Sequence, residues 1–147
     1  RSEAPGTDDV RLVAIRATND GTSTFMTSSA IRIEMQLVNE RIMDTDLNIQ
    51  LVVRTDTDVI AFVSDMTEVL GTAPWPLGDN MIVCTLPPDL LNDGGYRLSV
   101  VFQRKGNRHF HVLDALAFEV QEGPRKGAWF QKWPGALRPK LEWERWT

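Results

Sequence analysis

Two histidines, His109 and His111, have the spacing that comes nearest in this sequence to a metal-binding or catalytic pair. On a β-strand, side chains two residues apart point to the same face, so both imidazoles could hold a metal ion or contact a sugar. Zinc sites add cysteine or carboxylate ligands at short spacings, and none accompanies this pair. Two exposed histidines at a sheet edge are therefore the favoured interpretation, and we predict no metal site and no cofactor.

Two Asp-Thr-Asp triplets, at 44–46 and 56–58, could hold a divalent cation through carboxylate oxygens. Nucleotide-sugar transferases that use such a pair carry it beside an α/β nucleotide-binding domain, whose sequence pattern is missing here. Aspartate side chains also bond nearby backbone amides, which favours turns at both triplets. The sequence has neither a G-x-S-x-G elbow nor a P-loop, while a β-sandwich hydrolase with two distant carboxylates stays open.

Amide, guanidinium and hydroxyl side chains occupy alternate positions in several apolar–polar repeats. Such groups bond sugar hydroxyls in planar geometry, and a tryptophan ring can stack on the apolar face of a pyranose. A plain solvated sheet face is also polar, so the pattern alone does not separate a binding face from a wet one. The candidate carbohydrate-binding residues are Gln50, Arg54, Arg97, Ser99 and Gln103, followed by His109 and by Trp75 in its proline-flanked loop.

The elements that must position these residues are strands. Hydrophobic side chains recur with a period of two, which is typical of half-buried strands, and turn-forming residues separate the repeats. This pattern predicts an all-β fold, an antiparallel β-sandwich of about 7–9 strands. Clear strands are expected at 30–38, 47–55 and 96–103, weaker ones at 10–18, 59–64, 80–86 and 114–120, and a helical turn at 87–91.

One local motif makes the sandwich immunoglobulin-like. Tyr96 follows Leu90 by six residues, with Asn-Asp-Gly-Gly between them. This spacing matches the tyrosine corner, in which the ring packs under a turn and its hydroxyl bonds a nearby backbone group. Leu98 stands where antibody domains have their second cysteine, so we expect the version without the disulfide.

Composition limits the function classes. The chain has 147 residues and a net charge of −4, which favours one domain and argues against general nucleic-acid binding. No apolar run is long enough to span a membrane, and the single Cys84 favours a reducing compartment. We interpret residues 1–9 as a linker remnant from a longer protein and residues 10–147 as the sandwich domain.

The sequence resembles a known module over nearly its whole length. The most specific stretches are "LPPDLLNDGGYRLSV" at 86–100 and "GALRPKLEW" at 135–143. Together with the order of the other strands, these stretches resemble the C-terminal domain of Wzt, the nucleotide-binding subunit of ABC transporters that export lipopolysaccharide O-antigen. The same module also occurs attached to glycosyltransferases and methyltransferases.

The resemblance implies a non-catalytic domain that binds the finished O-antigen polysaccharide, often through a modified non-reducing end. It also implies a homodimer, formed in one version by exchange of a terminal strand, and an ATPase domain that connects this domain to a transmembrane permease. The compartment would be the cytoplasm, at the inner membrane. Two alternatives stay open: a structural dimerisation domain, and an accessory glycan-binding domain of a glycan-modifying enzyme.

The C-terminal tail is rich in tryptophan and broken by proline. Because proline cannot donate to a β-ladder, Pro139 predicts that a last strand lies at a sheet edge. Leu137, Leu141 and Trp143 are expected to anchor this strand, whereas the rings of Trp129, Trp133 and Trp75 are expected to be available to a ligand.

Overall fold

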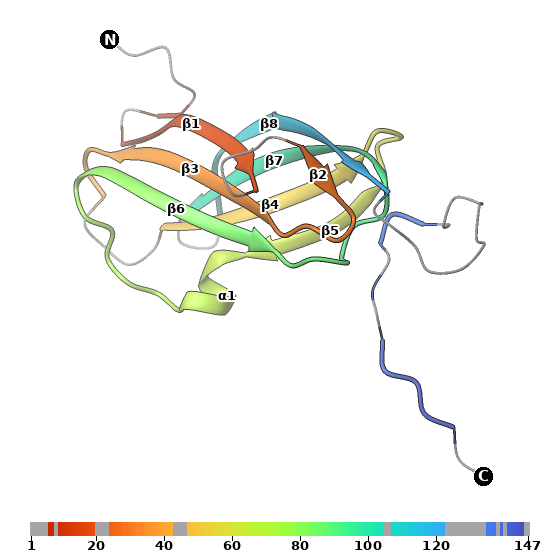
Figure 1. Cartoon of the computed structure of the whole chain (residues 1–147). Coiled ribbons are helices and arrows are strands. Elements are labelled where there is room, and N and C mark those ends of the chain that lie inside the picture. The colour runs from red at the N-terminus through yellow and green to blue at the C-terminus, as the bar shows by residue number, and fades with distance from the viewer. Residues whose placement is uncertain are drawn as a thin grey trace.

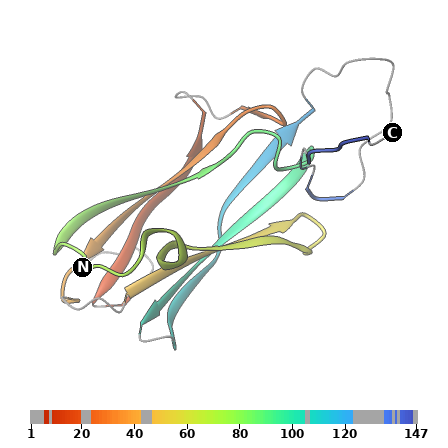
Figure 2. The same ribbon diagram turned by 90° about the horizontal axis from the view of Figure 1, so that it is seen from below.

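Two β-sheets pack face to face in the computed structural model, which describes residues 6–7, 9–19, 24–42, 47–104, 107–122, 135–137, 139 and 141–145 (Figures 1 and 2). The three-stranded sheet has the order β1 (Val10–Thr18), β3 (Ile31–Asn39) and β6 (Gly78–Leu86). The five-stranded sheet has the order β2 (Phe25–Met26), β8 (Asn107–Gln121), β7 (Gly94–Arg104), β4 (Leu47–Thr55) and β5 (Ile60–Asp65). A short helix, α1 (Met66–Leu70), follows β5 directly.

The predicted β-sandwich is confirmed, with several local differences. The two-residue strand β2 was not expected, and it pairs with β8 in parallel, whereas the other strand pairs are antiparallel. Residues 88–90 form a turn and not a helical turn, because Asp89 has a φ of 62°, outside the helical region. The helix lies instead at α1, where Asp65 caps the N-terminus by accepting from the backbone N–H of Glu68.

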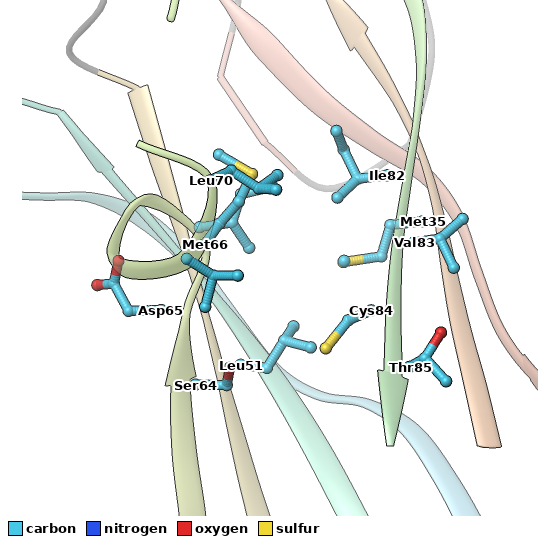
Figure 3. Close-up of a pocket in the computed structure, with 12 residues that line it drawn as sticks. Met35, Leu51, Ser64, Asp65, Met66, Leu70, Ile82, Val83, Cys84 and Thr85 are labelled. Atoms are coloured by element: carbon cyan, nitrogen blue, oxygen red, sulfur yellow. The ribbon is translucent and has the colours of Figure 1, made fainter. Parts of the chain in front are cut away.

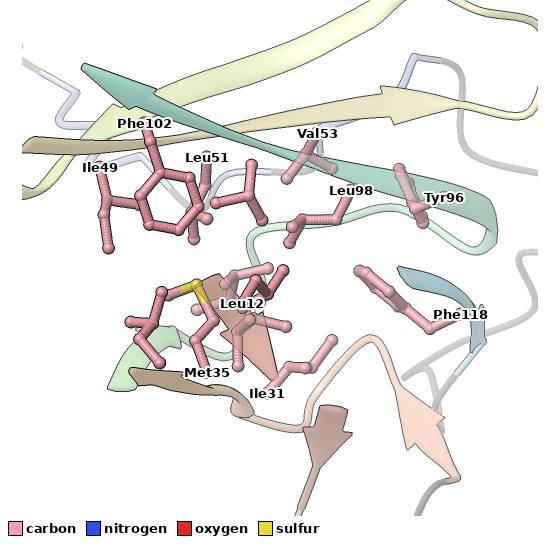
Figure 4. Packing of buried hydrophobic residues seen from close by; sticks show 14 of the residues in the cluster. Leu12, Ile31, Met35, Ile49, Leu51, Val53, Tyr96, Leu98, Phe102 and Phe118 are labelled. Atoms are coloured by element: carbon pink, nitrogen blue, oxygen red, sulfur yellow. The ribbon is translucent and has the colours of Figure 1, made fainter. Parts of the chain in front are cut away.

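The core consists of the alternate apolar side chains that each sheet turns toward the other (Figure 4). Leu12, Ile31 and Met35 come from the three-stranded sheet, and residues such as Val53 and Phe102 face them from the five-stranded sheet. The hydrophobic residues that recur at every second position in the sequence thus form one buried face on each sheet. The opposite faces of both sheets carry polar side chains together with exposed apolar ones such as Val63, Met81 and Val83.

Strand β8 is longer than the sequence pattern predicts, because β-bulges interrupt its alternation. Its pairing with β7 shifts between Leu98 and Val100 and again between Phe102 and Gln103. Asp114 lies in the first bulge with a φ of 50°, a conformation that aspartate tolerates better than most residues. The apolar–polar period was therefore visible only over 114–120, although the strand begins at residue 107.

The tyrosine corner is present and holds part of the tail. The hydroxyl of buried Tyr96 lies 2.6 Å from the carbonyl oxygen of Asn92 and 2.9 Å from that of Ala136. The backbone N–H of Asn92 also donates to Ala136, and Leu91 forms a β-bridge with Leu137. Burial, together with the nearby carboxylates of Asp93 and Asp56, raises the pKa of Tyr96 to about 12.

Two expectations are wrong: that Leu141 and Trp143 anchor a last strand, and that the ring of Trp75 is available to a ligand. Beyond Leu137, the tail residues Leu141 and Trp143 are 70% and 90% exposed, so they do not anchor a strand on this domain (Figure 1). Trp75 is only 9% exposed and packs in the core, because its loop crosses the end of the sandwich next to buried Asn39, whose amide donates to the Trp75 carbonyl. Trp129 and Trp133 lie outside the described residues.

Candidate functional site

The solvent-facing side of β5, β4, β7 and β8, called here the outer face, gathers most of the predicted site residues. Strand register places Gln50 beside Asp65 on one side and Val101 on the other. Further along the same two strands, Val52 of β4 pairs with Ser99 of β7, and Arg54 of β4 pairs with Arg97 of β7. Each of these positions alternates with a buried core residue, so its side chain belongs to the outer side of the sheet. The face thus has polar ends and a band of valine across its middle.

One end of the outer face is an amide cluster, defined as Asn48, Gln50, Asp65 and Gln103. The Asn48 amide nitrogen donates to the Asp65 carboxylate at 2.9 Å and to the Gln103 side-chain carbonyl at 3.0 Å. The Gln50 amide nitrogen donates to the same Asp65 oxygen at 2.9 Å. Burial would raise the pKa of Asp65, but hydrogen bonds from Gln50, Asn48 and Thr67 outweigh it and lower the pKa to about 2.

The other end is an arginine cluster, defined as Arg54, Arg97, Asp58 and Asp114. Arg97 donates to Asp58 at 3.0 Å and to Asp114 at 3.3 Å. Arg54 lies 3.8 Å from the same Asp58 oxygen. Asp58 belongs to the turn at 56–58 that joins β4 to β5, where the sequence predicted a turn rather than a cation site. Two guanidinium groups and two carboxylates leave this cluster without net charge.

A valine band, defined as Val52, Val63 and Val101, separates the two clusters. Val52 pairs with Val63 on β5, and Val101 pairs with Gln50 on β4. Val63 is about half exposed. An apolar strip between two sets of fixed donors and acceptors suits a ligand with C–H faces and hydroxyl edges, which is the amphipathic character of a sugar ring.

Three of the predicted site residues do not offer a free group to a ligand here. Ser99 is 2% exposed, and its hydroxyl accepts the backbone N–H of Asp114 at 3.0 Å, which fixes the bulge in β8. His109 lies in the β-bulge of β8 opposite Phe102 and Gln103, and its ring nitrogen lies 3.2 Å from the Thr7 hydroxyl near the start of β1. Trp75, buried in the core, presents no stacking surface.

Sequence reasoning missed Asp65, the residue that orders the amide cluster. Its partners Asn48 and Gln103 come from strands far apart in the chain, so their meeting could not be read from local spacing. A local signal did exist, because Asp65 followed three residues later by Glu68 is a helix N-terminal pattern. That pattern would have ended β5 at Asp65 and placed its carboxylate at the sheet boundary.

A separate cleft of about 280 Å³ lies at the side of the sandwich where β5 and β6 are the last strands (Figure 3). Met35, Met66 and Ile82 line it together with Cys84, whose thiol pKa is raised by burial. Figure 3 shows the carboxylate of Asp65 turned away from this cleft. The cleft is therefore mainly apolar and offers few groups that could orient a sugar.

The described residues hold neither a group of potential metal ligands nor a helix able to span a membrane. In that part of the chain, no three histidine, cysteine, aspartate or glutamate side chains gather in a group that could hold a metal ion. The described residues also contain no helix with the length and hydrophobicity needed to cross a membrane.

The fold is that of the C-terminal domain of Wzt. The crystal structure of that domain superposes with a TM-score of 0.74 at 14% sequence identity, covering 99% of this chain and 90% of the other. A Bacteroides fragilis protein assigned as a beta-galactosidase superposes with a TM-score of 0.48 at 12% identity, over 73% of this chain and 16% of its own. No protein-family model and no curated protein matches the sequence.

Proposed function

We propose that this chain is a non-catalytic carbohydrate-binding domain whose ligand is a finished O-antigen polysaccharide, recognised at its modified non-reducing end. The observation that carries the proposal is the outer face, where a valine band lies between two clusters of ordered hydrogen-bonding side chains. The likeness of the fold to the C-terminal domain of Wzt supports it.

Binding on this face would combine two terms. The apolar side of a sugar ring would cover the valine band, and its hydroxyl groups would bond the amide and arginine clusters. Each unmatched buried polar group costs about 1–3 kcal/mol, so a glycan with a misplaced hydroxyl would be rejected more strongly than its few contacts suggest. Selectivity among polysaccharides would come from this penalty.

The resemblance to Wzt also supplies the setting of the proposal. The domain would follow an ATPase domain in a longer protein and act in the cytoplasm at the inner membrane, beside a transmembrane permease. Glycan binding would couple completion of the chain to its export. The exposed Leu141 and Trp143 would be covered in a homodimer, in which the tail of one copy packs on the other.

Isothermal titration calorimetry tests the proposal directly. O-polysaccharide purified from the source strain should give saturable heat with this domain, and polysaccharide of an unrelated serotype should give none. Arg97→Ala should weaken binding by roughly tenfold or more, because hydrogen bonds to charged groups are worth about 1.5–3 kcal/mol. Arg32→Ala is the matched control, since Arg32 is exposed on the opposite sheet.

The alternatives give different results in the same experiments. A structural dimerisation domain would form a tight dimer and show no heat with either polysaccharide. An accessory domain of a glycan-modifying enzyme would bind glycan, but its full-length gene would encode a methyltransferase or glycosyltransferase and no ATPase.

A further inference from the structure

We infer that the amide cluster is a subsite for two adjacent hydroxyl groups of a neutral sugar and that Asp65 is its positioning residue. The inference rests on the proposed function and makes it more specific. It concerns a set of side chains, Asn48, Gln50, Asp65 and Gln103, in which two members were not expected from the sequence to take part in binding.

The cluster is ordered by the carboxylate of Asp65, which accepts from four donors. One oxygen accepts from the hydroxyl of Thr67 at 2.9 Å and from the backbone N–H of Glu68 at 3.2 Å, at the first turn of α1. The other oxygen accepts from the side-chain amides of Asn48 and Gln50, both at 2.9 Å. A carboxylate with this many donors is held in one orientation and stays ionised near neutral pH.

The direction of each amide follows from that anchor. The side-chain oxygen of Asn48 accepts from the backbone N–H of Thr67 at 3.1 Å, so its nitrogen must face Asp65 and Gln103. Since the Asn48 nitrogen is a donor, Gln103 must turn its oxygen toward it and its nitrogen away. Gln50 likewise turns its nitrogen to Asp65 and leaves its oxygen outward. These orientations are dictated by donors and acceptors that cannot be exchanged.

The result is one fixed acceptor beside one fixed donor. Within the described part of the chain, the Gln50 side-chain oxygen and the Gln103 side-chain nitrogen have no hydrogen-bond partner. The two residues are diagonal neighbours on β4 and β7, because Asn48 is opposite Gln103 and Gln50 is opposite Val101. Diagonal positions lie about 7–8 Å apart at Cα, within the span that a pair of long side chains can close on one sugar edge.

Two adjacent sugar hydroxyls match this arrangement. One hydroxyl would donate to the Gln50 oxygen, and its neighbour would accept from the Gln103 nitrogen. Because the protein groups are already oriented, little side-chain entropy is lost on binding. The ligand is expected to be neutral, since the arginine cluster on the same face is balanced by Asp58 and Asp114 and the amide cluster carries only the Asp65 charge.

Periodate oxidation of the polysaccharide tests the diol. Periodate cleaves the bond between two carbons that bear adjacent hydroxyls and leaves two aldehydes, which borohydride then reduces to alcohols so that no reactive group remains on the polymer. Intact O-polysaccharide of the source strain should bind in calorimetry, and the oxidised and reduced form should bind at least tenfold more weakly. In an NMR spectrum of the nitrogen-labelled domain, the side-chain amide signals of Gln50 and Gln103 should shift with the intact polymer only.

Variants separate a binding role from a structural one. Gln103→Glu keeps the size of the side chain and its contact oxygen but removes the outward donor, and we expect roughly tenfold weaker binding. The new carboxylate lies close to ionised Asp65, so the unfolding midpoint should fall slightly, and binding is compared well below that midpoint. Gln36→Glu, on the exposed face of the other sheet, is the matched control and should bind normally. Asp65→Asn should broaden or move the amide signals of Asn48 and Gln50 even without ligand, which a purely helix-capping role would not do.

The outcomes distinguish this inference from the proposed function. If the intact polysaccharide binds while Gln103→Glu and periodate treatment leave the affinity unchanged, the diol subsite is wrong and the carbohydrate-binding function stands. If the intact polysaccharide does not bind at all, both are wrong. Loss of binding on oxidation, together with the amide shifts and the Gln103→Glu effect, supports the subsite.

Discussion

Replacing Tyr96 with phenylalanine would measure what the tyrosine corner contributes to this sandwich. The hydroxyl is the only group removed, and the ring keeps its stack on Phe118, whose ring centroid is 5.7 Å away. In the variant, the carbonyl of Ala136 still accepts a hydrogen bond from the backbone N–H of Asn92 at 2.9 Å. The main loss is therefore the 2.6 Å hydrogen bond from the Tyr96 hydroxyl to the Asn92 carbonyl. Tyr96 is 3% exposed, so water does not easily replace that donor.

The expected cost follows from that geometry. Losing one buried hydrogen bond and leaving a carbonyl with one donor fewer should lower the free energy of unfolding by about 1–2 kcal/mol. For a chain of this length, the melting temperature should fall by about 3–8 °C. Urea unfolding followed by circular dichroism gives the first quantity and calorimetry the second. Thr57→Val, which removes an exposed hydroxyl, should change stability by less than about 0.5 kcal/mol.

The ionisation of Tyr96 offers an independent check. Its pKa is raised to about 12 in the folded state from an ordinary value of 10. The folded state therefore keeps its proton when the unfolded chain has lost it, so this part of the stability is complete below pH 10 and disappears as the pH rises toward 12. Tyr96 is the single tyrosine of the chain, so tyrosinate absorbance near 295 nm reports on it alone.

Two results would refute the reasoning. A loss below about 0.5 kcal/mol in Tyr96→Phe would mean that the hydroxyl exchanges freely with water. A folded-state absorbance midpoint near pH 10, equal to that in urea, would mean that the ring is not shielded as the structure requires.

Three other substitutions test further features of the structure, through stability in two cases and through the proposed dimer in the third. Asp65→Ala should lower the free energy of unfolding by about 1 kcal/mol, because the cap of α1 is lost. Folding lowers the Asp65 pKa from 3.8 to about 2, so the extra stability of the wild type should be complete above about pH 4 and vanish as the pH falls to about 2. If unfolding followed by circular dichroism shows the same dependence of stability on pH in both proteins, this prediction is wrong. Asn39→Ala should cost about 2–3 kcal/mol in urea unfolding, since its buried amide donates to the Ile42 carbonyl at 2.8 Å and accepts its N–H at 2.9 Å; a smaller loss would mean that water fills the site. Trp143→Ser should leave stability within about 0.5 kcal/mol and abolish the proposed dimer in light scattering, and a persistent dimer would exclude the tail from the interface.

Local alternation was enough to predict the strands whose pairing is regular. Strands β3 and β4 show uninterrupted burial of every second residue, and their predicted bounds agree with the structure to within one residue. Strand β8 was predicted too short because two β-bulges interrupt its alternation of apolar and polar residues. A bulge depends on the partner strand as much as on its own sequence, so the period alone could not show it.

The candidate site was predictable as a face but not as a set of contacts. Gln50, Arg54, Arg97 and Gln103 reach the outer face because alternation decides the side of the sheet. Whether a side chain is free there depends on long-range partners: a bulge residue on β8 occupies the hydroxyl of Ser99. Asp65 became central only through the pairing of β5 with β4, which no local spacing reveals.

The two long sides of the sandwich differ in how firmly they are closed. On one side, β8 reaches β1 of the other sheet, and His109 contacts Thr7 across the seam. On the other side, β5 and β6 end their sheets without pairing, and the apolar cleft lies between them. The two sheets are therefore joined along β1 and β8 and not along β5 and β6. Thermal opening and amide exchange should begin along β6, the strand of its sheet that lies farthest from the β1–β8 contact.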